Sequence, residues 1–168
     1  MIVTIDELKD IRVHHENKNI VLTNGTFDML HVGHLRYLNA VKRYGEILVV
    51  LLSSDVRVRA RKGPERPVIS ENDRAQMLDA LKVVDYVMID PANFKLGSSD
   101  PVYAKILALL KPDEFVTDSE STRFTADILN KTKMIVLRRD EASNSEEEIN
   151  TSTTATIERV IKTRQSKR

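Results

Sequence analysis

Residues 23–34, TNGTFDMLHVGH, place two glycines, an aspartate and two histidines in a pattern that suits phosphate binding. His31 and His34 are three residues apart, so on a helix they share one face and point the same way. Gly25 and Gly33 allow tight turns or the close approach of a ligand to the backbone. Two imidazole donors at a helix N-terminus, where N–H groups favour an anion, would stabilise the charge on a phosphoryl group during its transfer.

The same stretch has two other interpretations. The spacing of the two histidines is compatible with a metal site, although the sequence marks no third ligand. Ordinary packing and helix capping would explain each residue singly, and the role of Asp28 could be to satisfy the N–H groups of a turn. Taken alone, the stretch leaves these alternatives open.

Length and composition indicate one compact domain, 1–168. With 168 residues, 19.1 kDa and 41% apolar residues, the chain can build a real core. A net charge of +1 argues against a dedicated nucleic-acid binder, which would carry a marked basic excess. No run reaches the roughly 18 apolar residues of a membrane span, and the first 15 residues contain acidic ones instead of an apolar signal core. The lack of cysteine excludes disulfides and thiolate metal sites. We therefore expect a cytoplasmic protein with neither nucleic acid nor membrane among its partners.

The residues that could do chemistry must be positioned by elements of two alternating kinds. Short, nearly continuous apolar runs rich in Val and Ile predict strands covered on both faces, as in a parallel sheet. There are five such runs, at 19–23, 46–53, 84–89, 113–117 and 133–137. Together with the intervening helical stretches they predict a Rossmann-like α/β fold, a doubly wound five-stranded parallel sheet flanked by helices.

Apolar residues at helical spacing mark the helices between these runs. The stripes are Leu35, Leu38 and Val41; Met77, Leu78 and Leu81; Ile106, Leu107 and Leu110; and Ile157, Val160 and Ile161. Gly45 should end the first helix, and Ser70 with Asp73 resembles a capping box that opens the second. Pro112 should close the third.

Two segments do not fit this scheme. Residues 55–67 alternate apolar and basic side chains like a strand, yet their position between a strand and a helix equally permits a short helix and a loop. The acidic segment 138–150 has no periodicity, which predicts an exposed, mobile loop inserted before the last helix.

Three ordered segments resemble the cytidylyltransferase-like nucleotidyltransferases. Residues 23–38 resemble the family's strand followed by G-x-F-D-x-x-H-x-G-H, residues 62–89 its K-G-x-x-R-P segment and helix with an early arginine, and residues 151–161 its S-T-T segment. The resemblance covers a core of about 18–161 and is greatest to the adenylyltransferase domain of bacterial ADP-heptose synthases. The sequence also resembles glycerol-3-phosphate cytidylyltransferases and archaeal FAD synthases, but less strongly.

The resemblance implies an enzyme that joins a nucleoside triphosphate, ATP or CTP, to a phosphorylated acceptor and releases pyrophosphate. His31, His34 and Lys62 match catalytic positions that stabilise the transition state or reach the reacting phosphates. The matched nucleotide-binding positions are Thr26, Phe27, Gly33, Arg74, Ser152 and Thr153. Further candidates are Asp28, Asp118, Glu120 and Arg139. Mg2+ would accompany the triphosphate, with no protein ligand assigned. Relatives are often homodimers, so a homodimer is a further expectation.

The chain departs from the family pattern after the fourth strand, where relatives carry a glycine and this sequence reads FVTDSESTRF. The departure leaves the donor, ATP or CTP, and the acceptor open. A phosphorylated sugar or polyol resembling heptose 1-phosphate is the favoured acceptor, and FAD synthesis from FMN is the alternative. A nucleotide- or RNA-binding module without turnover is the rival of another class, motivated by the basic residues between 57 and 66.

Overall fold

The computed structural model describes residues 1–91, 101–118, 132–137 and 157. In chain order its elements are β1 (Ile2–Val3), a 3-10 helix (Ile5–Glu7), α1 (Leu8–His14), β2 (Ile20–Gly25), α2 (Val32–Lys42), β3 (Ile47–Leu52), α3 (Asp55–Lys62), α4 (Glu71–Asp79), β4 (Tyr86–Ile89), α5 (Pro101–Leu110), β5 (Glu114–Thr117) and β6 (Lys133–Val136). The predicted acidic loop at 138–150 and, apart from Ile157, the predicted last helix lie outside the described residues.

The strands form one parallel sheet in the order β1-β4-β3-β2-β5-β6, which confirms the predicted doubly wound, Rossmann-like α/β fold. The predicted number of strands was wrong, because the sheet already has six strands among the described residues and not five. The additional strand is β1, in which Ile2 and Val3 pair with Val87 and Met88 of β4. A strand of two residues is too short to produce a recognisable apolar run.

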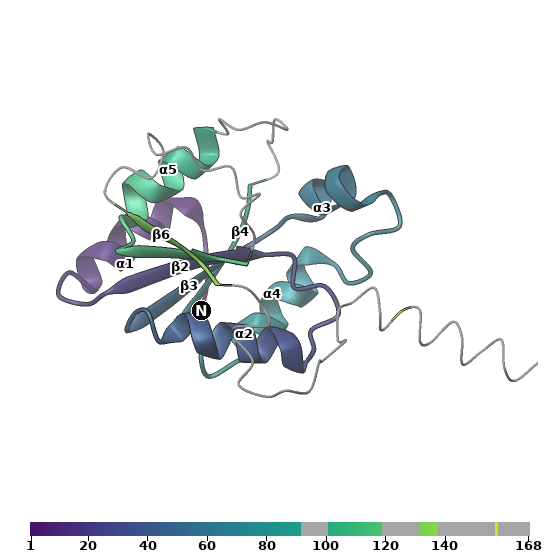
Figure 1. The fold of residues 1–168 in the computed structure, drawn as a ribbon. Coiled ribbons are helices and arrows are strands. Elements are labelled where there is room, and N and C mark those ends of the chain that lie inside the picture. Colours follow the sequence, from purple (N-terminus) through teal and green to yellow (C-terminus); the bar gives the residue numbers. More distant parts are fainter. Residues whose placement is uncertain (92–100, 119–131, 138–156, 158–168) are drawn as a thin grey trace, which may run out of the picture.

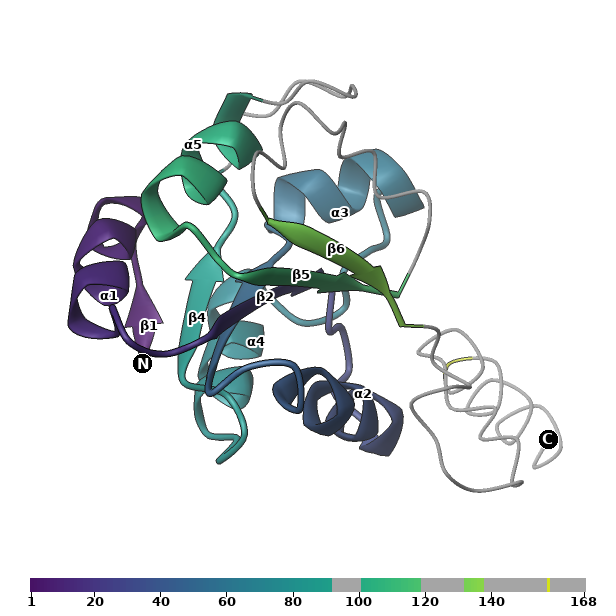
Figure 2. The ribbon, with the colours of Figure 1, turned by 60° about the vertical axis from the view of Figure 1, so that its left-hand side comes forward.

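Helices cover both faces of the sheet. Figures 1 and 2 show α1 and α5 together on one face and α2 and α4 on the other. Successive strand residues serve alternate cores, because side chains along a strand point to opposite faces. Val21 and Leu48 pack with α2 and α4, whereas Leu22 and Val49 pack with α1 and α5. This explains why the apolar runs are nearly continuous.

Segment 55–67, whose structure the sequence left open, begins as helix α3 and continues as a loop. Ser54 is the N-cap, and its side chain accepts a hydrogen bond from the Arg57 N–H. Val58 is 1% exposed and Val56 is 49% exposed, so the two valines do not share a face as they would in a strand. Gly63 ends the helix with a φ of 96°, which favours glycine.

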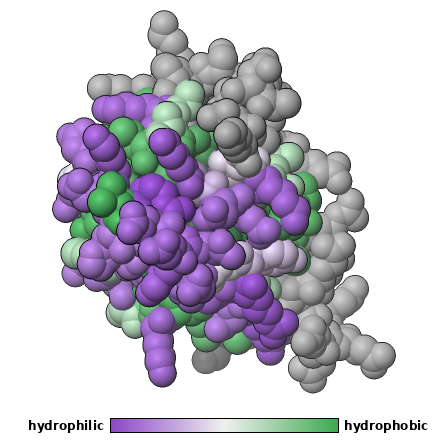
Figure 3. Space-filling view, turned by 90° about the vertical axis from the view of Figure 1, so that its left-hand side faces the viewer, coloured by the Kyte–Doolittle hydropathy of each residue, from purple (hydrophilic) through white to green (hydrophobic). Residues whose placement is uncertain are grey.

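Two of the predicted helix ends hold, but the one at Gly45 was wrong, because α2 ends at Lys42 with Arg43 as its C-cap. Ser70 caps α4 by accepting a hydrogen bond from the Asp73 N–H at 3.3 Å, and α5 ends at Leu110, before Pro112. In α2, however, Leu35 is 39% exposed and the buried stripe begins at Tyr37 instead. No helix among the described residues has the length and apolar character to cross a membrane. On the side of α1, hydrophilic side chains cover most of the surface (Figure 3).

Candidate active site

The strand order reverses between β2 and β5, which places a topological switch point at the carboxyl ends of these two strands. Ligands of open α/β sheets bind in the crevice outside such a point. Thr26 follows the last residue of β2, and Asp118 follows the last residue of β5. Both predicted site residues therefore lie at this position.

His31 and His34 form a stacked pair at the N-terminus of α2. Their ring centroids are 3.9 Å apart with an interplanar angle of 26°, so the rings share one side of the first turn, as their spacing predicts. His31 is the N-cap, and its Nδ1 accepts a hydrogen bond from the Gly33 N–H at 3.1 Å. An accepting Nδ1 places the proton of a neutral imidazole on Nε2. The ring of His31 can therefore cap the helix and present an Nε2–H donor at the same time.

The loop between β2 and α2 has a constrained backbone. Phe27 and Met29 have φ values of 47° and 49°, in the left-handed region that costs a non-glycine residue about 1 kcal/mol or more. The Phe27 ring folds back over Gly25, where a Cβ would lie 2.6 Å from its Cε2 atom. Its edge contacts His34, with centroids 5.3 Å apart. The residue is 4% exposed and its ring packs in the core under α2 and α4.

Asp28 satisfies backbone N–H groups of a segment distant in the sequence. Its carboxylate accepts hydrogen bonds from the N–H groups of Val68 and Ile69, all at 3.1 Å. It also pairs with the Arg66 guanidinium at 2.8 Å. The residue is 1% exposed. Asp28 therefore joins the first motif to the segment that follows the K-G-x-x-R-P motif, some 40 residues further along the chain.

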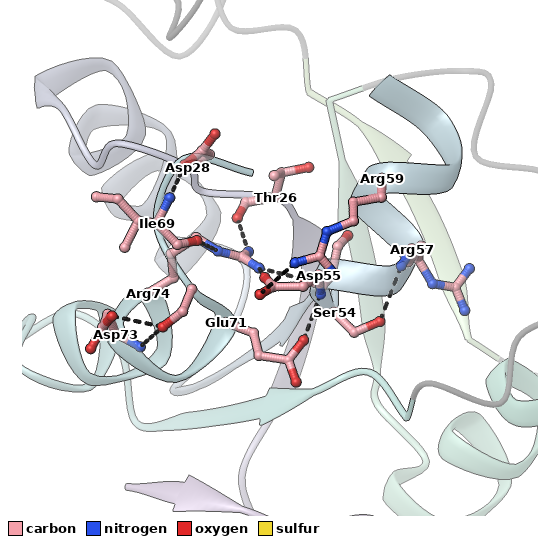
Figure 4. Close-up of polar contacts among 12 residues, drawn as sticks. Thr26, Asp28, Ser54, Asp55, Arg57, Arg59, Ile69, Glu71, Asp73 and Arg74 are labelled. Atoms are coloured by element: carbon pink, nitrogen blue, oxygen red, sulfur yellow. Dashed lines mark hydrogen bonds and ion pairs between the residues drawn. The ribbon is translucent and has the colours of Figure 1, made fainter. Parts of the chain in front are cut away.

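Arg74 is buried, and its guanidinium contacts protein groups (Figure 4). Its Nε and NH1 donate to the carbonyl oxygens of Ile69 and Thr26. Its NH2 donates to the carbonyl oxygen of Ser53 at 3.0 Å and to Asp55 at 2.7 Å. One side chain thus joins the β2 loop, the end of β3, the start of α3 and the segment before α4.

Lys62 is exposed and is the last residue of α3. The other end of that helix is firmly anchored. Arg57 forms a buried ion pair with Asp90, which follows β4, and its guanidinium lies 5.0 Å from the ring centroid of Tyr103 on α5. The backbone N–H of Asp55 also donates to Glu71. These contacts fix the helix from which Lys62 projects.

Sequence reasoning did not identify the cluster of Asn24, Arg57, Asp90 and Tyr103 around this anchor. Burial raises the pKa of Tyr103, the nearby Asp90 carboxylate raises it further, and Arg57 and a hydrogen bond with Asn24 act in the opposite direction. A polar residue directly after an apolar strand, as Asp90 is, was the available signal. The predicted site residues Glu120, Arg139, Ser152 and Thr153 lie outside the described residues.

Within the described part of the chain, the metal interpretation of the histidine pair gains no third ligand. Among the residues that the structure describes, no group of three or more histidines and carboxylates could hold a metal ion. Of the nitrogen atoms of the pair, His31 Nδ1 already accepts the Gly33 N–H. The arrangement is better suited to hydrogen-bonding an anion, because an imidazole N–H and main-chain amides are donors.

Comparison with known proteins places this geometry in a family. The model of the cytidylyltransferase-like family matches residues 22–159. The chain is 40% identical over 162 residues to the "Bifunctional protein HldE" of Helicobacter pylori strain Shi470, and the match covers 96% of this chain and 32% of the relative. The corresponding protein of Campylobacter fetus is 42% identical over 121 residues, which are 72% of this chain and 24% of that protein. The chain thus spans about a third or less of the length of the curated relatives it matches.

Solved structures agree on the fold. The lipopolysaccharide core biosynthesis protein of Thermoplasma volcanium is 27% identical with a TM-score of 0.56, and the match covers 71% of this chain and 96% of that one. Pantothenate synthetase of Thermus thermophilus, 16% identical with a TM-score of 0.51, shares the fold over 82% of this chain and 61% of that one. With the family model matching most of the chain and the histidine motif at the switch point, the chain belongs to the cytidylyltransferase-like family of nucleotidyltransferases.

Proposed function

We propose that the chain transfers a nucleoside monophosphate from ATP or CTP to a phosphorylated sugar or polyol and releases pyrophosphate. An acceptor resembling heptose 1-phosphate and ATP as donor are favoured, because the sequence most resembles the adenylyltransferase domain of bacterial ADP-heptose synthases. The HldE relatives, at about 40% identity over nearly the whole chain, support this choice. The similarity to a lipopolysaccharide core biosynthesis protein also agrees with a sugar acceptor.

The observation that carries the proposal is the stacked imidazole pair at the switch point. An oxygen of the acceptor phosphate attacks the α-phosphorus of the nucleotide, the new P–O bond forms, and the bond to pyrophosphate breaks in line. Negative charge grows on the α-phosphoryl oxygens and on the leaving group, and imidazole donors placed beforehand stabilise it. Lys62 would contact the α-phosphate or the acceptor phosphate, and Ser152 and Thr153 the β- and γ-phosphates.

Main-chain groups of the loop complete the proposed cradle. Thr26, Phe27 and Gly33 would line the triphosphate through their backbone. Arg74 would serve the same cradle indirectly, by holding the loop through the carbonyl oxygen of Thr26. Asp118, at the end of β5, together with Glu120 and Arg139, would contact the nucleotide or the acceptor.

Mg2+ would be held by the triphosphate itself. The carboxylate of Asp28, the acidic group of the loop, is already engaged by two backbone N–H groups and a guanidinium. Bound Mg2+ would neutralise phosphate charge while the donors of the chain orient the reacting groups. We expect chelation of divalent ions to abolish turnover and added Mg2+ to restore it.

A pyrophosphate-release screen tests the proposal. It crosses ATP, CTP, GTP and UTP with heptose 1-phosphate, glycerol 3-phosphate, FMN and phosphocholine. Release with ATP and heptose 1-phosphate that falls by about a hundredfold or more in His34→Ala is the expected result, since one such donor contributes about 3 kcal/mol. Conversion of FMN to FAD would replace the acceptor assignment. Robust turnover by His34→Ala would refute the mechanism.

A further inference from the structure

We propose that Arg74 and Asp28 form a clasp that holds the loop 26–29 in its phosphate-binding conformation, and that Arg74 acts through this loop without touching the nucleotide. The inference rests on the proposed function, because it assigns the loop a polyphosphate ligand. Both clasp residues are 1% exposed. Their partners lie on segments far apart in the sequence, which only the fold brings together (Figure 4).

The contacts of Arg74 argue for a positioning role. An arginine has five N–H donors, and four of these meet the carbonyl oxygens of Ile69, Thr26 and Ser53 and the carboxylate of Asp55. The planar guanidinium cannot turn toward a phosphate without giving up buried carbonyl partners, which is costly. Its side chain is also fully buried. The charge therefore ties the loop to the end of β3, the start of α3 and the segment before α4.

Asp28 supplies the second half of the clasp. Its two oxygens accept from Val68 N–H and Ile69 N–H and pair with Arg66. Ile69 belongs to both halves, because its N–H donates to Asp28 while its carbonyl accepts from Arg74. The loop and the segment 66–69 are thus joined at two points by buried, charge-assisted hydrogen bonds, which are stronger than neutral ones.

The loop needs such a clasp because its backbone is strained. Phe27 and Met29, on either side of Asp28, both have positive φ values. Strained conformations persist where the surroundings over-determine them, and they concentrate at ligand-binding sites. Without the clasp the loop would relax, and its main-chain groups would no longer face the phosphates at the N-terminus of α2. The clasp therefore prepares the cradle before the nucleotide arrives.

Arg12 provides a control at the amino ends of the strands. Its side chain is 17% exposed, against 0% for Arg74, and it donates to the carbonyl oxygens of His15 and Lys18 and to the carboxylate of Asp113. Its chemistry resembles that of Arg74, but its partners precede β2 and β5 and lie at their amino ends. Lysine cannot reproduce either set of hydrogen bonds, because it lacks the planar fork. Arg12→Lys thus measures the general cost of such a loss.

The experiment compares Arg74→Lys and Asp28→Asn with Arg12→Lys in the full chain. Hydrogen–deuterium exchange follows the peptides that cover 24–31 and 66–70, isothermal titration measures the affinity for inorganic tripolyphosphate, and pyrophosphate release gives kcat and KM. We expect both clasp variants to exchange faster in these peptides and to bind tripolyphosphate at least about tenfold more weakly. We also expect kcat/KM for the nucleotide to fall about a hundredfold, the effect of losing one preorganised donor, with little change in KM for the acceptor.

The outcomes separate the clasp from the proposed function. A wild-type chain that binds tripolyphosphate but releases no pyrophosphate would refute the function and leave the clasp to be judged by exchange and affinity. The clasp is refuted if wild type does not bind tripolyphosphate, or if Arg74→Lys binds it as wild type does. Equal losses of tripolyphosphate affinity in Arg12→Lys would also refute it, since the effect would then be one of global stability.

Discussion

At the scale of single residues, Gly25 is constrained by the ring of Phe27. A Cβ at this position would lie 2.6 Å from Cε2 and 2.9 Å from Cζ of that ring. The ring is buried and contacts His34, so it cannot move aside without disturbing the imidazole pair. We expect Gly25→Ala to lower the unfolding free energy by about 1–3 kcal/mol and to lower kcat. Urea denaturation and pyrophosphate release measure the two effects.

The double variant Gly25→Ala/Phe27→Leu is the control for this contact. Leucine lacks the ring atoms that a new methyl group would meet, so the double variant should be more stable than the sum of the two single changes predicts. Neighbouring residues in contact commonly show interaction energies of about 0.5–3 kcal/mol. Strictly additive losses would show that the Phe27 ring is not what Gly25 accommodates.

The raised pKa of Tyr103 predicts how the unfolding free energy of the protein changes at alkaline pH. Burial, together with Asp90, raises its pKa above the ordinary value of 10.0. The folded state then holds this proton more tightly than the unfolded state, so the stabilisation is complete below pH 10.0 and is lost as the pH rises through the folded pKa. We expect the stability of wild type to fall more steeply above that pH than the stability of Tyr103→Phe. If the unfolding free energies of wild type and Tyr103→Phe fell in parallel as the pH rose, this prediction would be contradicted.

The residue scale also shows what sequence could predict of the site. The spacing of His31 and His34 was sufficient to place both rings on one side of a helical turn. The same reasoning could not find the partners of Asp28 and Arg74, because these lie on segments brought together by the fold. A sequence motif marks an arginine without showing whether it faces a ligand or the protein interior.

At the scale of elements, α3 depends on the buried ion pair between Arg57 and Asp90. Their side chains are 8% and 0% exposed. Removing one partner of such a pair leaves a buried charge without its counterion, at a cost of about 3–5 kcal/mol. We expect Asp90→Asn to lose this much stability in chemical denaturation and to raise the KM for substrate, because α3 carries Lys62.

An exposed pair provides the comparison for that prediction. Lys105 and Asp6 are 3.8 Å apart, with side chains 57% and 88% exposed. Water screens such a pair, so Asp6→Asn should cost well under about 1 kcal/mol. If both variants lost equally little, the Arg57–Asp90 pair would not anchor α3.

Elements with a recognisable pattern of apolar residues could be predicted from the sequence. Elements that form only by pairing with another strand could not. Four of the five apolar runs became strands with both faces covered, whereas in β6 Met134 is 38% exposed. In contrast, β1 is a strand only through its pairing with β4, and two residues carry no pattern. The alternation in 55–67 left helix and strand equally open, and the Ser54 cap together with the pairs of Asp55 and Arg57 accounts for the helix.

At the scale of the whole molecule, the sheet separates two hydrophobic cores, of which one supports the helix that carries the imidazole pair. The core under α2 and α4 includes Leu38, one turn beyond His34 on the helix that begins with the imidazole pair. The core under α1 and α5 includes Leu8, on a helix that carries none of the proposed site residues. Both leucines are 0% exposed, so they are matched in burial. The two cores should therefore contribute alike to stability but not to catalysis.

Truncation of these two leucines tests that division. Leu8→Ala and Leu38→Ala should each lower the unfolding free energy by about 2–5 kcal/mol, through lost burial and the cavity left behind. Well below the melting temperature, Leu8→Ala should keep the kcat of wild type, because its cavity lies across the sheet from the site. Leu38→Ala should lower kcat, because α2 can settle into the cavity and shift His34, and small misplacements at a reacting centre are costly. Stopped-time pyrophosphate assays at a temperature where both variants are fully folded make the comparison, and equal kcat values would show that the site does not depend on the packing of α2.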